Sequence, residues 1–342
     1  MFYQRLVVRL MDKKRIVLAY IVIFLLLFIC IALSVTCGVR DVGIKSIIGA
    51  FVNNAAPKIE VNIVLARIPR TVFGILAGAA LGISGQLMQS VTRNPIADPS
   101  ILGVNTGASL AVVCGITFFN IQNGNQYIWL AFAGAIITAV LVYGLASMGR
   151  EGATPIRLAL AGAAASTALQ SLVNTVMLPN TQVMDQFRFW QVGSIGGATW
   201  EDIRIMLPYI IVGFAIAFLL MPSLNTLALG DDVATGLGVN VTAVRMLAAV
   251  AGVLLCASVT ALAGPISFIG LMVPHVIRAF TGPEIKRVMP LSALTGACIL
   301  LISDVLGRLL GRPGELESGI ITALIGGPVF ILIIRKVKVH SL

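Results

Sequence analysis

The feature that most constrains this chain is a succession of long apolar segments separated by short polar ones. Each has roughly the ~20 residues that a helix needs to cross the hydrocarbon core of a bilayer, where backbone polar groups must be satisfied within the segment. Ten such segments lie near residues 16–36, 71–90, 101–119, 127–148, 156–178, 203–221, 241–262, 266–280, 289–306 and 318–334. The sequence therefore predicts an all-α polytopic membrane protein with about ten transmembrane helices.

Composition and charge agree with this class. Hydrophobic residues make up 58% of the 342 residues and charged residues only 11%, against ~25% charged in soluble domains. The net charge of +10 comes from basic residues in tails and short loops, which indicates membrane topology rather than nucleic-acid binding. The five cysteines have no CxxC spacing, so we expect packing residues and predict no metal site, disulfide framework or cofactor. They are Cys30, Cys37, Cys114, Cys256 and Cys298.

The distribution of basic residues predicts the orientation. Both tails are basic, and fifteen of the 24 Lys and Arg residues fall on one side if both termini are cytoplasmic. We therefore expect one transmembrane domain over residues 1–342, with 1–15 as a cytoplasmic tail. The first apolar segment is too long for the apolar part of a signal peptide, so we expect it to be retained. The nine basic residues on the outer side are Arg40, Lys45, Lys58, Arg67, Arg70, Arg188, Arg204, Arg308 and Arg312.

Two of these outer arginines, Arg67 and Arg70, stand three residues apart at the start of the second apolar segment, with Pro69 between them. One interpretation is that both extend toward lipid phosphates. The other is a shared partner, because residues three apart lie on one face of a helix. The residues alone leave both interpretations open.

Small residues predict close helix packing in the second segment. Gly74, Gly78 and Gly82 are spaced by four and form a small-xxx-small ridge on one helix face. Residues 159–169 and 321–330 are similarly rich in small side chains. Those segments are candidates either for lining a path or for plain helix packing.

Three other classes of protein are weaker interpretations. The stretch GISG, residues 82–85, could place Ser84 as the nucleophile and His275 as the base of an intramembrane protease, but nothing in the sequence brings the two together. An ion-coupled carrier would need deep ionisable groups, and Asp304 is the one candidate. A local ion pair with Arg308, four residues on, explains it equally well. No P-loop motif is present, so this chain is not expected to bind ATP that way.

One inner segment suggests a docking point. Residues 223–240 read SLNTLALGDDVATGLGVN, in which Asp231 or Asp232 could cap a short helix that Gly236 or Gly238 ends. A turn with no partner is the alternative.

Several stretches together resemble the FecCD-type permeases of bacterial ABC importers, which carry iron-siderophores, haem or cobalamin. The resemblance runs from about residue 61 to the C-terminus. It rests on RIPRTVFGILAGAALGISGQLMQSVTRNPIADPSILGVNTGASLA, FWQVGSIGGATW, LALGDDVATGLGVNV, GPISFIGLMVPHVIR and LISDVLGRLLG.

This resemblance implies ten helices per subunit, a second permease subunit as a homodimer or related heterodimer, two ATPase subunits below and a solute-binding protein above. It implies that Arg67, Arg70 and Arg308 receive glutamates of the binding protein, with Arg312 as the rival of Arg308. It also implies that residues 224–238 couple to the ATPase. The residues named for coupling are Leu224, Leu227, Leu229, Gly230, Asp231, Asp232, Gly236 and Gly238.

The resulting expectation is a multi-pass permease of the bacterial inner (plasma) membrane that moves an Fe(III)-siderophore by alternating access. Haem or cobalamin is the alternative cargo. ATP hydrolysis is expected on a separate subunit, and this chain is expected to be neither an enzyme nor a nucleic-acid binder. Small and polar side chains predict the translocation path, and the residues named for it are Asn105, Thr106, Ser109, Ser166 and Gln170.

Overall fold

The computed structural model describes the chain apart from residues 1, 41, 44–57, 122–123, 149–153 and 337–342. Its described part contains twelve α-helices and one 3₁₀ helix, η1, and no strand. The α-helices are α1 (Phe2–Thr36), α3 (Lys58–Thr92), α4 (Val104–Phe119), α5 (Gly124–Ser147), α6 (Pro155–Met177), α7 (Thr181–Val192), α8 (Trp200–Leu227), α9 (Asp231–Gly236), α10 (Val241–Ala263), α11 (Ile269–Thr281), α12 (Ile285–Leu310) and α13 (Ser318–Lys336), and η1 is Pro99–Leu102.

Seven of the described helices are long and apolar enough to cross a membrane: α1, α3, α5, α6, α8, α10 and α12. Three shorter apolar helices, α4, α11 and α13, lie at the other three segments where the sequence predicted spans. The all-helical, polytopic prediction is confirmed. The count of ten membrane crossings stays a prediction.

The helices differ from the predicted segments in several places. Helix α3 begins at Lys58 rather than at residue 71, so Arg67 and Arg70 lie within it, about 14 to 18 Å from its first residue at ~1.5 Å per residue. Residues of the predicted cytoplasmic tail form the start of α1 from Phe2 onward, and the location of this tail stays a prediction. Helix α7 was not predicted, because its twelve residues include no long apolar run.

The segment predicted to begin at residue 101 opens with η1 instead of with an α-helix. The side chain of Asp98 accepts a hydrogen bond from the backbone N–H of Ser100 and caps η1. Gly103 then takes the left-handed conformation, with φ of 71°, and α4 starts at the next residue. A side chain at residue 103 would strain this turn and meet Thr138 of α5.

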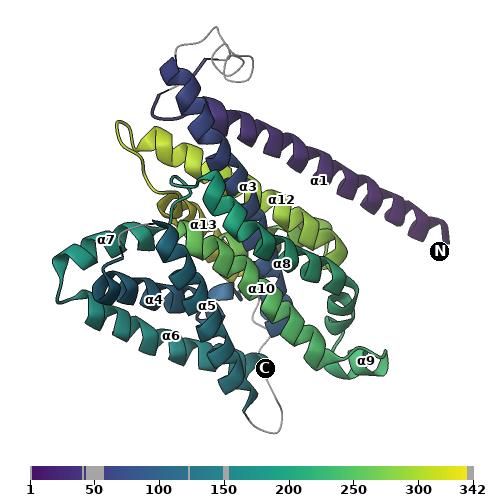
Figure 1. Cartoon of the computed structure of the whole chain (residues 1–342). Helices are drawn as coiled ribbons and strands as arrows, with labels where there is room; N and C mark the ends of the chain where they lie inside the picture. Colours follow the sequence, from purple (N-terminus) through teal and green to yellow (C-terminus); the bar gives the residue numbers. More distant parts are fainter. Residues whose placement is uncertain (1, 41, 44–57, 122–123, 149–153, 337–342) are drawn as a thin grey trace.

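Helix α3 lies at the centre of the helix bundle. It packs against α12, α10, α11 and α8, and Figure 1 shows α12, α10 and α8 beside it. The predicted glycine ridge is the reason that α12 comes so close. A Cβ atom at Gly78 would lie 2.4 Å from the carbonyl oxygen of Gly296, and one at Gly82 would lie 2.3 Å from that of Ser292. The packing prediction from small-residue spacing is therefore confirmed.

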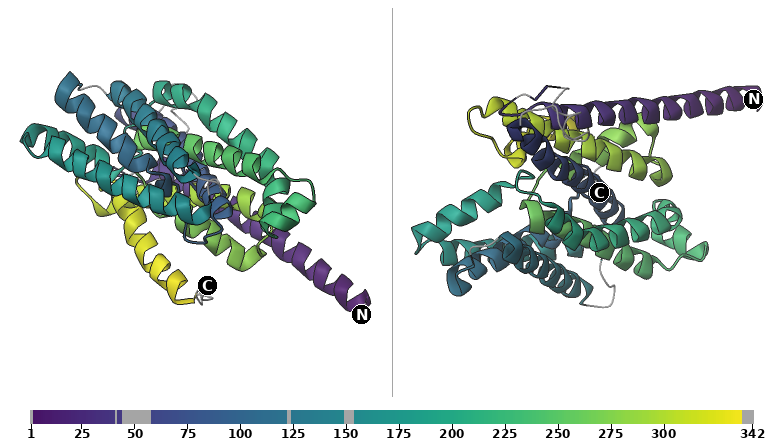
Figure 2. Two further views of the ribbon diagram at one scale, coloured as in Figure 1. Left: turned by 90° about the horizontal axis from the view of Figure 1, so that it is seen from below. Right: turned by 45° about the horizontal axis from the view of Figure 1, so that its top comes forward.

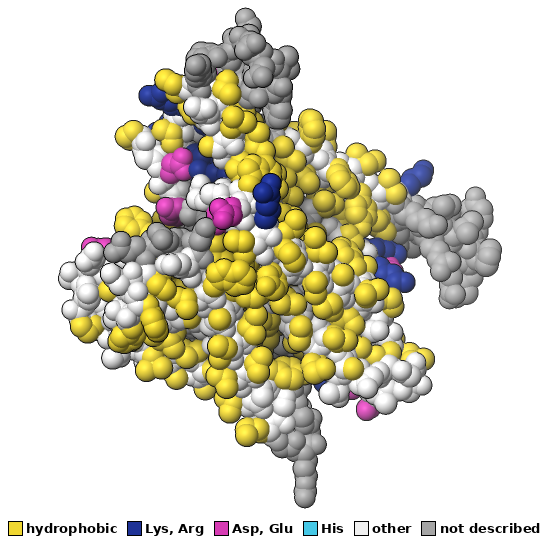
Figure 3. All heavy atoms as spheres, viewed as in Figure 1, with side chains coloured by type: hydrophobic (Ala, Val, Ile, Leu, Met, Phe, Trp, Pro, Cys, Tyr) yellow, Lys and Arg dark blue, Asp and Glu magenta, His cyan; other side chains and the backbone are white. Residues whose placement is uncertain are grey.

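The bundle has two ends. Helix α1 finishes beside Arg67 and Arg308, so we call this the arginine end. The opposite end carries α9, and Figures 1 and 2 show the first turns of α1 pointing away from the arginine end; we call the opposite end the α9 end. On the face seen in Figure 3, apolar side chains cover most of the surface, while charged side chains gather toward the upper left and the right edge.

Candidate functional site

At the arginine end, a buried ion cluster joins α3 to α12. The Asp304 carboxylate accepts from Arg70, with Nη2 to Oδ1 at 2.7 Å, and lies 2.9 Å from Nη2 of Arg308. Side-chain exposure is 1% for both Asp304 and Arg308. The predicted local pair between Asp304 and Arg308 is thus confirmed. A buried carboxylate between two guanidinium groups is stabilised by charge-assisted bonds that offset much of its desolvation.

Arg67 and Arg308 donate hydrogen bonds to the C-terminal end of α1. Arg67 donates from Nη1 to the carbonyl oxygens of Val35 and Thr36, each at 2.9 Å. Arg308 donates from Nη1 to those of Ser34 and Cys37, also at 2.9 Å. The last carbonyls of a helix lack intrahelical partners and carry partial negative charge, so cations there are favourable. Arg67 is buried and bonded to the end of α1, so the lipid-snorkelling interpretation, which was made for Arg67 and Arg70, fails for Arg67.

Arg70 faces outward from the same cluster. Its Nη1 lies 2.8 Å from Oε2 of Glu315, whose side chain is 41% exposed. Arg312, the predicted rival of Arg308, is exposed and donates to the carbonyl oxygen of Gly38. Among the described contacts of the three arginines predicted to dock a partner, the bond from Arg70 to Glu315 is one to an exposed carboxylate.

A polar pocket of about 430 Å³ lies between α4, α6, α7, α13 and the connection from α10 to α11. Four of the five predicted path residues line it: Asn105, Thr106, Ser109 and Gln170. The fifth, Ser166, accepts a hydrogen bond from the Thr106 hydroxyl at 3.4 Å. The structure thus brings together residues that lie up to 65 positions apart in the sequence.

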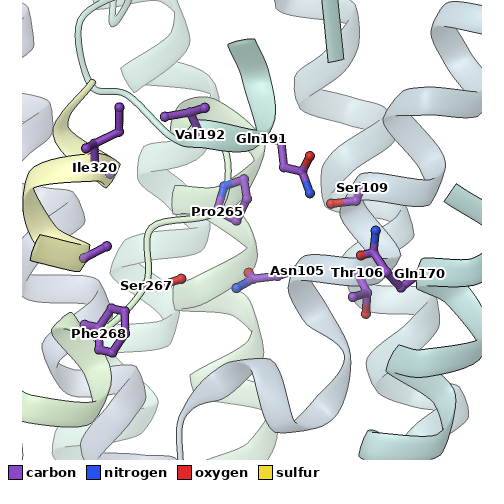
Figure 4. A pocket seen from close by; sticks show the side chains of 12 residues that line it. Asn105, Thr106, Ser109, Gln170, Gln191, Val192, Pro265, Ser267, Phe268 and Ile320 are labelled. Atoms are coloured by element: carbon purple, nitrogen blue, oxygen red, sulfur yellow. The ribbon is translucent and has the colours of Figure 1, made fainter. Parts of the chain in front are cut away.

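The pocket wall offers neutral hydrogen-bonding groups. None of its described lining residues is charged, and Asn105, Gln170 and Gln191 contribute carboxamides. Figure 4 shows the Gln191 and Ser109 side chains pointing toward each other, with Asn105 nearby. The Oδ1 atom of Asn105 accepts from the Thr260 hydroxyl of α10 at 3.1 Å.

Sequence reasoning missed part of this wall. Gln191, Ser267 and Phe268 also line the pocket, and nothing in the local pattern around them marks them as path residues. Phe268 has φ of 70°, a conformation that is rare for an aromatic residue, and it precedes the first turn of α11. Its ring packs edge-on against that of Phe330 in α13, with centroids 6.4 Å apart.

At the other end of the bundle, Asp231 anchors α9. Its carboxylate accepts from Arg245 of α10 at 3.0 Å and from Arg93 at the end of α3. The prediction that Asp231 or Asp232 caps this helix was wrong, because Gly230 is the N-cap residue and no side chain caps it. Helix α9 ends at Gly236 as predicted, and Gly238 follows with φ of 82°.

Exposure divides the predicted coupling residues into two groups. Leu224 and Leu227 are each 1% exposed, so they anchor the end of α8 and cannot contact a partner. Leu229 is 66% exposed, and Asp232, Gly236 and Gly238 are also exposed. Two further apolar residues that were not named, Val233 and Leu237, are exposed beside them. We call Leu229, Asp232, Val233 and Leu237 the α9 surface.

Comparison with known proteins decides the family. The FecCD transport family matches residues 25–336. The chain belongs to the FecCD transport family. This FecCD chain is 40% identical over 315 residues to the ferric enterobactin transport system permease protein FepD of Escherichia coli (strain K12), covering 92% of this chain and 94% of that protein. It is 39% identical over 317 residues to the Fe(3+)-citrate import system permease protein YfmD of Bacillus subtilis (strain 168), with the same coverage.

A solved structure agrees with this family. An inward-facing structure of an ABC transporter of the metal-chelate type superposes with a TM-score of 0.79 at 26% identity, covering 92% of this chain and 98% of that one. The FecCD chain is accordingly an ABC-type transport permease with the helical fold of such permeases. The resemblance predicted from sequence motifs is confirmed.

The two rival interpretations fail on the geometry of the FecCD chain. The Ser84 hydroxyl is fully buried and donates to the carbonyl oxygen of Gly252 at 2.6 Å, so it does not pair with His275 as a protease dyad requires. The Asp304 carboxylate is held by Arg70 and Arg308. Its bonds leave it poorly suited to bind a coupling ion.

Proposed function

We propose that this protein is the membrane subunit of an ATP-powered importer that moves an Fe(III)-siderophore from a solute-binding protein into the cytoplasm by alternating access. The observation that carries the proposal is the uncharged, hydrogen-bonding pocket inside a FecCD permease. Carboxamide and hydroxyl groups can donate to the oxygen-rich surface of a ferric chelate. They hold it less tightly than paired cations would, which suits passage rather than storage.

The proposed topology has ten crossings with both termini in the cytoplasm of a bacterial inner membrane. Supporting it, the three shorter apolar helices occupy predicted spans. Arg93 and Arg245 also meet at the α9 end, where both bond to Asp231. Basic residues favour the cytoplasmic side. The arginine end would then face outward, where the rule expects few basic residues. Arg67, Arg70 and Arg308 stand there because they bond to the end of α1 and to Asp304.

The proposed partners are two ATPase subunits, a second permease subunit and a binding protein. The α9 surface supports the ATPase subunits as partners. Exposed apolar side chains grouped beside an exposed acid, here Asp232, are typical of a docking site. Closure of the ATPases would move α9, which Asp231 ties to α3 and α10. ATP-driven rigid-body motion could in this way reach the helices around the pocket.

The binding protein is proposed to place glutamates at the arginine end, around Arg67, Arg70 and Arg308. The bond between Arg70 and Glu315 supports an exchange mechanism. An exposed carboxylate already occupies one side of the guanidinium, and a glutamate of the partner could take its place. Arg67 and Arg308 would contribute positive potential and a fixed α1 rather than direct contacts. Such an exchange would be sensitive to salt.

The test is uptake of radioactive iron by cells that carry the whole transporter, offered catecholate, hydroxamate and citrate chelates in turn. Labelled haem and cobalamin are the competing cargoes. Ala323 lines the pocket, whereas its neighbour Leu324 is 64% exposed and does not. We expect Ala323→Trp to abolish uptake of one iron chelate and Leu324→Trp to preserve it at equal membrane abundance.

Each outcome either identifies the cargo or contradicts the proposed function. Uptake of haem or cobalamin alone would replace the siderophore by that cargo. Equal uptake by native protein and Ala323→Trp would mean that the pocket is not on the path. Uptake that persists without the ATPase but follows an ion gradient would make the protein a carrier.

A further inference from the structure

A second pocket, of about 630 Å³, opens between the first half of α1 and the helices α11 and α12. Its opposite wall belongs mostly to the last turns of α11, including Phe280, with Thr295 of α12 at the far end. The α1 side chains that line it recur at the spacing of one helix face, and they are Arg15, Leu18, Ala19, Val22 and Ile23. We call this the α1–α11 pocket.

The α1–α11 pocket closes toward the arginine end, because α1 meets α12 there. Ile23 is the last α1 residue in its lining, and the Ile23 carbonyl oxygen lies 3.9 Å from Sγ of Cys298 in α12. One turn further on, Cys30 packs with Cys298 and Leu301 in a buried cluster. Toward its start α1 stands apart from the rest of the bundle, as Figures 1 and 2 show. The two walls therefore diverge from Ile23 toward the start of α1.

The pocket extends from the level of the membrane surface to about the middle of a bilayer. The apolar span of α1 starts one residue before Arg15. The mouth lies at the α9 end, since Ile285, which begins α12, donates its N–H to Asn225 in the last turn of α8. From Arg15 to Ile23 the distance along α1 is about 12 Å at ~1.5 Å per residue. This is close to half of the ~30 Å hydrocarbon core.

The lining combines an apolar wall with one cation at its mouth. Among the described lining residues Arg15 carries the charge, and the others are apolar apart from two threonines. Arg15 is exposed. The acid at the start of α12, Glu284, pairs with Arg287 instead, at 2.6 Å. An apolar groove of one-leaflet depth with a guanidinium at headgroup level matches a phospholipid, which has hydrocarbon chains below an anionic phosphate.

We propose that the α1–α11 pocket binds one anionic phospholipid of the leaflet at the α9 end. Its headgroup phosphate bonds Arg15, since a guanidinium donates to two phosphate oxygens at once. Its acyl chain covers the apolar wall down to Ile23. A helix from a second subunit fits this groove less well. It would have to end at half depth, where the backbone groups of a helix end have no partners in hydrocarbon.

Native mass spectrometry of the full-length chain tests this site by counting bound lipids. The delipidated protein in detergent is titrated with phosphatidylglycerol and, separately, with phosphatidylethanolamine that carries the same acyl chains. We expect the first phosphatidylglycerol to bind with a dissociation constant about fivefold lower, which corresponds to ~1 kcal/mol for one basic side chain near the headgroup. Glycerophosphoglycerol, the headgroup without chains, should not bind in the same concentration range, because it cannot cover the apolar wall.

Two pairs of variants assign the binding to the pocket. Arg15→Gln should lower the affinity for phosphatidylglycerol to that for phosphatidylethanolamine, whereas Lys14→Gln, the same charge change at an exposed residue outside the lining, should keep the preference. Ala19→Phe fills the pocket and should weaken binding of both lipids. Ile21→Phe should leave it unchanged, because Ile21 is 58% exposed and does not line the pocket. Arg15 is itself exposed, so its substitution should leave folding intact.

Several results would overturn the inference. Equal affinity for the two lipids, or equal loss of preference in Arg15→Gln and Lys14→Gln, would remove Arg15 as the headgroup ligand. Binding of glycerophosphoglycerol as tight as that of the lipid would indicate an anion site without an acyl chain. If Ala19→Phe retained its lipid but dissociated a dimer in the same spectra, the groove would be an interface between copies. The assay needs no ATPase, cargo or binding protein, so its outcome is independent of the proposed function.

Discussion

At the scale of single residues, the charged side chains inside the bundle bond to other groups of this chain. Arg67 and Arg308 hold the last carbonyls of α1, and Asp304 holds Arg70 and Arg308. This answers why unneutralised arginines stand at the end of an apolar segment: they satisfy backbone acceptors that would otherwise be buried without partners.

Asp304→Asn should be strongly destabilising. It removes the negative charge between Arg70 and Arg308, which are 11% and 1% exposed. Arg308 then loses its described acid partner, and Arg70 keeps only the pair with the exposed Glu315. Loss of one partner of a buried ion pair costs about 3–5 kcal/mol. The measurement is the free energy of unfolding of the detergent-solubilised protein, or its thermal midpoint where unfolding is irreversible.

The matched control for this prediction is Glu315→Gln. It removes the other acid that pairs with Arg70, but Glu315 is 41% exposed. Exposed pairs contribute up to about 1 kcal/mol. If the two variants were equally stable, the cluster would not stabilise the fold in the way that its burial indicates.

At the scale of elements, α3 and α12 are joined by backbone contact, and glycine permits it. Gly82→Ala should destabilise by about 1–3 kcal/mol, because the added methyl group would lie 2.3 Å from the Ser292 carbonyl oxygen and force the helices apart. Gly144→Ala is the control, since a Cβ at Gly144 of α5 meets nothing within 4 Å. Its better helix propensity should make it neutral or slightly stabilising, and a loss equal to that of Gly82→Ala would refute the packing argument. Thermal denaturation of both variants in the same detergent gives the comparison.

The features that could be predicted from the sequence are those indicated by residues close together in the chain. Apolar length predicted the long helices, four-residue spacing predicted the α3–α12 contact, and i,i+4 spacing predicted the Asp304–Arg308 pair. The Arg70–Asp304 pair joins residues 234 positions apart, which no spacing rule reaches.

Path residues show the same limit. Asn105 and Gln170 were predicted from their polarity within apolar segments, but Gln191 was missed because it lies on α7, a short helix without an apolar stripe long enough to reveal it. The capping role given to Asp231 or Asp232 was wrong for a related reason: the Asp231 carboxylate has tertiary partners, Arg93 and Arg245, that compete with local capping.

Helix α9 carries the next prediction, on coupling. Val233→Asp should abolish co-purification of the ATPase and chelate uptake while leaving membrane abundance unchanged, because Val233 is 48% exposed and lies on the α9 surface. Thr235→Asp is the control, because Thr235 is an exposed residue of the same helix and its hydroxyl donates to the carbonyl oxygen of Asp231. Asp231 is unsuitable for this test, since its substitution would break the ion pairs that hold α9. Undiminished ATPase binding by Val233→Asp would rule out this surface as the coupling site.

At the scale of the whole molecule, the two ends of the bundle are distinguished by which segments meet there. The end of α3, helix α9 and the start of α10 meet at one end through Arg93, Asp231 and Arg245. The end of α1, the α12–α13 connection and the α7–α8 junction lie at the other. A topology is therefore fixed once a single residue at either end is assigned to a side of the membrane.

Cysteine labelling makes this assignment. In a chain whose five native cysteines are replaced by alanine, Gln182→Cys at the start of α7 and Thr235→Cys in α9 are both exposed positions on opposite ends, separated in the chain by α8. A membrane-impermeant maleimide should label Gln182→Cys in intact spheroplasts and Thr235→Cys only after lysis, because the basic α9 end is expected to remain inside. The reverse pattern would invert the protein and exclude α9 as an ATPase contact. Labelling of both in intact spheroplasts would mean that α8 does not cross the membrane, and the count of ten crossings would fall.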